Sequence, residues 1–245
     1  MISELSTVGP FPKELSTDLD WRGKSYPKVH IVHGMNMNPT AMRKGSRENA
    51  HHENGGVISP EKCQALFRKA EGILPHSQLL GFDLIRDAAQ ARRQLDVLGK
   101  LLEKYPEPRS VIEAIEFADL GRRNALALWE DGKLVLDLGF VNGMGGMPPP
   151  GVDMMGYLIT HEFGHIMTDA SNSFGQCVTY LQGRGGTYSM NALLKLHQRG
   201  MISEYATRSW HEAVAEGFAR MEPSPDTATY IERHLHKLLG GKDES

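Results

Sequence analysis

YLITHEFGHIMTDA, residues 157–170, places His161 and His165 four residues apart, with Glu162 directly after the first histidine. Residues at this spacing share one face of a helix, so the two imidazoles can bind one ion. Glu162 lies one step round the helix, where its carboxylate can reach a water on that ion but is poorly placed as a ligand. This H-E-x-x-H spacing predicts a catalytic zinc site.

The chemistry of such a site needs one more protein ligand. Zinc accepts imidazole nitrogen readily, and with three protein ligands it keeps a fourth position for water. Glu162 is then the expected general base, which takes a proton as the water attacks a carbonyl and passes it to the leaving amine. The alternative is an ordinary buried helix that happens to contain two histidines, and a third ligand distinguishes the two.

Candidates for the third ligand lie downstream in SEYATRSWHEAVAEGFARM, which begins at Ser203. Glu212 and Glu216 are four residues apart and share a helical face, beside the packing residues Val214 and Phe218. Carboxylates are almost never fully buried unless they are paired or bind a metal. The spacing leaves open which glutamate binds zinc and which accepts a hydrogen bond from a ligand histidine.

The two motifs together, HEFGH and SEY(x)6EAVAEGFA, resemble the zincin domain of the anthrax lethal factor family, which includes the Pro-Pro endopeptidases and related bacterial and phage domains. The resemblance covers residues 76–238. The resemblance implies that His161, His165 and Glu212 bind zinc and that Glu162 is the general base. It also implies that Tyr205 binds the oxyanion and that Glu216 is a supporting carboxylate. Members often carry an acidic residue three positions after the second histidine, where this chain has Thr168 followed by Asp169.

The patterning around the motifs predicts an α+β fold. Leucines at helical spacing indicate a long helix over 76–104, after a shorter one that begins at Pro60 and runs to about Glu71. Three alternating runs, the last two joined by Asp131–Gly132, indicate a small sheet over residues 111–119, 124–130 and 133–140. Asp153 is the expected cap of the motif helix, which runs to about Thr168. A loop is expected over 171–189, then helices over 190–198, 209–221 and 230–239.

This order, helix then sheet then helices, is typical of α+β domains. We therefore expect a zincin-like metallopeptidase domain with a small mixed sheet, the HExxH helix and a C-terminal glutamate helix. The expected boundaries are an irregular N-terminal arm over residues 1–60, the domain over 61–240 and a frayed tail over 241–245. The run KLVLDLGF, residues 133–140, is the expected edge strand that pairs with the substrate backbone.

The composition excludes several classes of protein. The net charge of −3 over 245 residues gives no electrostatic footprint for nucleic acid. No stretch reaches the ~18 apolar residues of a membrane helix, and the N-terminus lacks a signal-peptide core. We expect a cytoplasmic protein, or a virion-associated one if it is phage-encoded. The two cysteines, Cys63 and Cys177, do not indicate a disulfide framework.

The expected function is that of a zinc-dependent metalloendopeptidase acting on a protein or peptide substrate. The alternative is a structural or assembly protein, for example of a phage particle, that uses the zincin fold as a scaffold. The irregular arm suits assembly with a protein partner. Four histidines of the arm are expected to be solvated (His30, His33, His51 and His52), and His211 is expected to face solvent.

Overall fold

The computed structural model describes residues 58–120, 127–138, 153–222 and 225–241. Residues 1–57 with the four histidines named above, residues 139–152 and the end of the tail lie outside them. In chain order the described elements are α2 (Pro60–Ile73), β1 (Gln78–Leu80), η1 (Phe82–Leu84), α3 (Ala88–Lys104), η2 (Glu107–Ser110), β2 (Ala114–Ala118), β3 (Ala127–Glu130), β4 (Lys133–Asp137), α4 (Met154–Ser171), α5 (Phe174–Gly185), α6 (Asn191–Gln198), η4 (Tyr205–Thr207), α7 (Trp210–Met221), η5 (Pro225–Thr227) and α8 (Tyr230–Leu238).

The sheet is small and mixed, as predicted. Its strand order is β1-β2-β4-β3, with the first two pairings parallel and β3–β4 antiparallel. Asp131 and Gly132 form the predicted hairpin turn, with φ of 47° and 78°. The prediction that residues 133–140 form an edge strand is wrong, because β4 pairs with β3 on one side and with β2 on the other. The edge strand beside the motif helix is β3.

The predicted long helix over 76–104 is wrong in its first third, where the chain forms β1 and η1 instead. Gly81 has φ of 69°, and a Cβ added there would lie 2.1 Å from the carbonyl oxygen of Phe117. Only glycine allows the backbone at residue 81 to lie this close to that of Phe117, and the chain here does not continue as a helix. Asp87 begins α3, since its Oδ1 accepts hydrogen bonds from the amides of Ala89 and Gln90 at 2.9 and 3.0 Å.

The predicted loop over 171–189 is also wrong, because most of it forms α5. Asn172, with φ of 53°, ends α4 in the left-handed conformation, and α5 starts two residues later. Cys177, Val178 and Leu181 are buried on one face of α5. The glycines and polar residues of this segment indicated a loop, because they outnumber the residues of this short apolar face.

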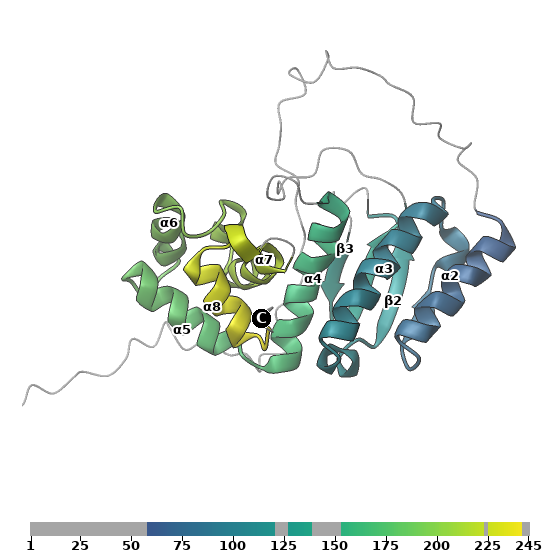
Figure 1. Cartoon of the computed structure of the whole chain (residues 1–245), viewed down its shortest axis with the longest axis horizontal. Helices are drawn as coiled ribbons and strands as arrows, with labels where there is room; N and C mark the ends of the chain where they lie inside the picture. Colours follow the sequence, from purple (N-terminus) through teal and green to yellow (C-terminus); the bar gives the residue numbers. More distant parts are fainter. Residues whose placement is uncertain (1–57, 121–126, 139–152, 223–224, 242–245) are drawn as a thin grey trace, which may run out of the picture.

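Helix α4 lies in the middle of the molecule (Figure 1), between the sheet with α2 and α3 on one side and the group α5–α8 on the other. Asp153 caps it as predicted, through a 2.7 Å hydrogen bond from the amide of Gly156. The main partner of α4 is α7, and the two backbones approach closely at Gly164, where an added Cβ would lie 2.8 Å from Cα of Ala215. None of the helices in the described ranges is long and apolar enough to cross a membrane.

Candidate metal centre

The packing of α4 against α7 brings His161, His165 and Glu212 together. One ligand atom from each lies within 4.8 Å of the others, and all three side chains are buried. No other group of three such side chains in the described part of the chain meets this condition. The geometry places Glu212 with the histidines, whereas the sequence spacing alone had left Glu212 and Glu216 as equal candidates.

The separations of the candidate ligand atoms fit a tetrahedral zinc ion. Oε2 of Glu212 lies 2.9 Å from Nε2 of His161 and 3.8 Å from Nε2 of His165. Two atoms each bound about 2.0–2.1 Å from a tetrahedral zinc are about 3.3 Å apart. The observed distances lie on either side of this value, and two imidazoles with one carboxylate form a donor set that zinc prefers.

The electrostatics of the group also favour a bound cation. His161 lies between two carboxylates, with Nε2 facing Glu212 and Nδ1 3.2 Å from Oε1 of Glu216. Burial disfavours a charged imidazole, but the hydrogen bonds to Glu212 and Glu216 outweigh it and raise the pKa of His161 well above its ordinary value. Without a metal, a proton on His161 compensates the buried negative charge, and a divalent cation would meet the same need.

The two carboxylate oxygens of Glu162 have different environments. Oε2 accepts a 2.9 Å hydrogen bond from the backbone amide of Trp129 on β3. Oε1 is buried and accepts no hydrogen bond from the described residues. Burial, the largest effect, raises the pKa of Glu162 to about 8. One oxygen is therefore fixed to the sheet, and the other has no hydrogen-bond partner among the described residues.

Tyr205 lies in η4, beside the first histidine. Its ring centroid is 5.5 Å from that of His161, and the two rings are at 78°. Burial, followed by the negative charge of Glu212, raises the pKa of Tyr205 above its ordinary value. The phenol therefore keeps its proton and can donate a hydrogen bond. The guanidinium carbon of Arg208 lies 4.4 Å from the ring centroid of Tyr205.

Glu216 contacts the histidine from the side opposite Glu212. Its Oε1 accepts a 2.9 Å hydrogen bond from Tyr157, and its Oε2 accepts one of 2.6 Å from Ser203. Burial acts to raise the pKa of Glu216, but the hydrogen bond to His161 and the others outweigh it, so the pKa is lowered. Glu216 is thus an ionised carboxylate in contact with Nδ1 of His161.

Three residues of this site were missed in the sequence, namely Trp129, Tyr157 and Ser203. Tyr157 and Ser203 belong to the two motifs, but neither has a ligand-type side chain that would single it out. Trp129 contacts Glu162 through its backbone amide, and no sequence pattern indicates which backbone amide will meet a given side chain. Its indole also donates a 2.7 Å hydrogen bond to Asp169, the residue after Thr168, so the acidic side chain there holds β3 against α4.

His211 is not part of the metal group. Its ring stacks on Phe174 of α5, with centroids 3.9 Å apart and planes at 17°. The expectation that His211 faces solvent is wrong, because its ring is half-buried in this contact.

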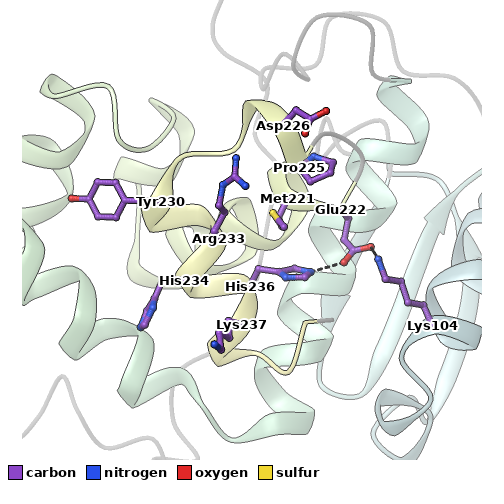
Figure 2. Close-up of a pocket in the computed structure, with 10 residues that line it drawn as sticks. All are labelled: Lys104, Met221, Glu222, Pro225, Asp226, Tyr230, Arg233, His234, His236 and Lys237. Carbon is purple, nitrogen blue, oxygen red and sulfur yellow. Dashed lines mark hydrogen bonds and ion pairs between the residues drawn. The ribbon is translucent and has the colours of Figure 1, made fainter. Parts of the chain in front are cut away.

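A pocket of about 750 Å³ lies away from these residues, beside the end of α7 and along α8 (Figure 2). Figure 2 shows Glu222 between Lys104, 3.0 Å away, and His236. None of the predicted site residues is among those lining it, which are Lys104, Met221, Glu222, Pro225, Asp226, Tyr230, Arg233, His234, His236 and Lys237. Because Glu222 is already bonded to Lys104 and His236, we assign the candidate site to the buried group between α4 and α7.

Comparisons with known proteins assign no family to the chain. No protein-family model, curated protein or solved structure matches it. The interpretation of this site therefore rests on its own residues and on the resemblance of its two motifs.

Proposed function

We propose that the protein is a zinc-dependent metalloendopeptidase with a zincin-like domain. The observation that carries the proposal is the buried group His161, His165 and Glu212 on two packed helices, with the carboxylate of Glu162 and the phenol of Tyr205 beside it. The resemblance of both motifs to the lethal factor family supports the same assignment. A chance pair of helical histidines would not be expected to meet a glutamate and a buried tyrosine from a segment about fifty residues away.

The three ligands would hold zinc, which when bound supplies a Lewis acid for activating water and polarising a carbonyl group. Oε1 of Glu162 is placed to take a proton from the attacking water, while the amide of Trp129 holds Oε2 still. The protonated phenol of Tyr205 is the donor available to a developing oxyanion. Glu216 orients His161 by accepting a hydrogen bond from Nδ1, which leaves Nε2 for the metal.

We propose that the substrate lies in extended form along β3. This strand forms the edge of the sheet next to α4, and strand addition is a common mode of peptide binding. The bond from the amide of Trp129 to Glu162 fixes this edge relative to the general base. A peptide on β3 would therefore have its backbone positioned with respect to the reacting groups.

A second candidate is a structural or assembly protein, and the direct contact between His161 and Glu212 favours it. The two side chains form a 2.9 Å ion pair, which can link α4 to α7 without any metal. In that case the group is a buried salt-bridge cluster and the domain is a scaffold. The two functions make opposite predictions for zinc content.

The test is zinc content and peptide cleavage by the purified full chain, compared with two variants. E162Q removes the general base but no ligand, and E204Q alters an exposed glutamate in the Tyr205 segment. We expect about one zinc per chain in all three proteins, with cleavage of a peptide library slowed about 10²–10⁴-fold in E162Q only. A protein without zinc, or equal cleavage by E162Q and wild type, would refute the proposal.

A further inference from the structure

The hydroxyl of Ser203 links Glu216 on α7 to the turn that carries Tyr205. It donates a 2.6 Å hydrogen bond to Oε2 of Glu216 on α7. It also accepts a 3.1 Å hydrogen bond from the backbone amide of Ala206. Ser203 precedes Tyr205 by two residues and Ala206 follows it directly, so this hydroxyl closes the turn that carries the phenol.

On the other side, Glu216 connects the same hydroxyl to the histidine. Its Oε1 faces Nδ1 of His161 at 3.2 Å and accepts the hydrogen bond from Tyr157. The bond from Ser203 is short and ends on a carboxylate oxygen of Glu216. With one oxygen held by Ser203 and the other by Tyr157, the carboxylate has one orientation in which it can meet His161.

We propose that Ser203 is a positioning residue that keeps the Tyr205 turn in register with the ligand His161. The proposal rests on the proposed function, because it assigns a task to Ser203 within that site. The amide of Ala206 is part of a residue that is only 1% exposed, so loss of its acceptor would leave a buried donor unsatisfied. Removal of the hydroxyl would therefore disturb the turn and the Glu216 carboxylate together.

The test compares S203A with T207A and S203T. Thr207 lies in the same turn and its hydroxyl bonds only locally, to the carbonyl of Glu204 at 2.7 Å, so T207A is the matched control. We expect S203A to bind zinc about 10–100-fold more weakly in a chelator competition. The Ala206 amide should exchange with solvent about 10-fold faster or more in NMR. T207A should have the zinc affinity and the Ala206 exchange rate of the wild type. S203T should have them too, because it retains a hydroxyl.

A double-mutant cycle separates positioning from simple loss of stability. If Ser203 acts through the phenol, S203A should lower kcat about 10-fold or more in the wild type but much less in a Y205F background, with KM similar throughout. Additive losses in kcat would overturn the proposal, as would unchanged zinc affinity and Ala206 exchange in S203A. Should S203A fail to fold by circular dichroism, S203C, which has a similar size and a weak hydrogen-bonding thiol, is judged by the same three readouts.

Failure of the proposed function would look different. A wild-type protein that binds no zinc would refute the metallopeptidase but not the link through Ser203. In that case the link is tested by solvent exchange of the Ala206 amide in the metal-free proteins. This exchange should be faster in S203A than in wild type or T207A. Equal exchange in all three proteins would overturn it.

Discussion

At the scale of single residues, the two glutamates of α7 have different tasks although they share one helical face. Oε2 of Glu212 contacts Nε2 of His161, whereas Glu216 contacts the opposite ring nitrogen and two hydroxyl groups. Spacing along the chain could not separate them, since both are one turn apart on the same helix. Only the position of α4 across from them decides which carboxylate meets Nε2.

The difference predicts unequal effects of two matched substitutions. On the proposed function, E212Q removes a charged zinc ligand and should abolish stoichiometric zinc binding in a chelator competition. E216Q removes only the charge behind His161 and should weaken zinc about 10–100-fold. Titration of zinc into each purified protein measures both constants. The reverse order, with E216Q the more damaging, would contradict the assignment of Glu212 as the ligand.

At the scale of elements, the site depends on how closely α4 and α7 approach. Gly164 is the point of contact, since an added Cβ would lie 2.8 Å from Cα and 2.9 Å from the carbonyl oxygen of Ala215. Backbone atoms cannot move out of the way as the end of a flexible side chain can. The distance between the two histidines and Glu212 is therefore set by a glycine that binds nothing itself.

A methyl group at this position should push the helices apart. We expect G164A to lower the free energy of unfolding by about 1–3 kcal/mol, as overpacking does, and to weaken zinc binding. G175A is the control, because nothing lies within 4 Å of its added Cβ on α5. Alanine there should be neutral or stabilise by up to about 1 kcal/mol. Urea unfolding and zinc titration of both variants test this, and equal behaviour would contradict it.

A second junction of elements makes stability depend on pH. Glu222 at the end of α7 is bonded to Lys104 and Tyr105 from the end of α3 and to His236 on α8. Burial opposes ionisation, but the hydrogen bonds from His236, Tyr105 and Lys104 outweigh it and lower the pKa of Glu222 below 4.5. A lowered folded-state pKa stabilises the protein above the ordinary value, and this contribution is lost as the pH falls through the folded-state value.

E222Q should therefore be less stable than wild type at pH 7, by on the order of 2 kcal/mol. The difference should shrink as the pH falls below about 4.5, where the wild-type carboxylate begins to lose its advantage. Urea unfolding at pH 7 and pH 3 measures this. E204Q, which alters an exposed glutamate, should show no such pH-dependent difference. A constant deficit in E222Q at both pH values would mean that its effect is steric.

The elements with strong local signals were predictable, and those made by distant contacts were not. Pro60, Asp153 and the Asp131–Gly132 turn act on their own neighbours, so a helix start, a cap and a hairpin were found at the right places. Strand β1 exists because it pairs with β2 more than thirty residues later, and no local pattern reports that pairing. The leucines nearby had indicated a helix instead. The same limit applies to Trp129, whose amide meets Glu162 only in the folded chain.

At the scale of the whole molecule, α4 is shared by the sheet and by the C-terminal helices. Its aromatic Phe163 packs in the core against Phe218 of α7 and against Tyr105 at the end of α3, and the rings of Phe218 and Tyr105 also contact each other. A ligand that links α4 to α7 is thus expected to stabilise both parts of the molecule at once, and not the helical part alone.

Zinc should therefore raise the temperature of one cooperative unfolding transition. At a free concentration about 100 times Kd, the expected gain is about 2.7 kcal/mol. Calorimetry with zinc and with a chelator measures it. H165A should lose the gain, while H76Q, which alters an exposed histidine before β1, should keep it. Two separate transitions, of which zinc moved only one, would contradict the coupling.

The distance along the chain between His161 and Glu212, 51 residues, has a consequence for synthesis. As the chain emerges from the ribosome, His161, Glu162 and His165 appear well before the segment that carries Glu212 and Tyr205. On the proposed function, a nascent or prematurely released chain that ends before α7 lacks the third ligand and the phenol. Peptidase activity would then arise only after almost the whole domain had been made, which protects neighbouring nascent proteins from an unfinished enzyme.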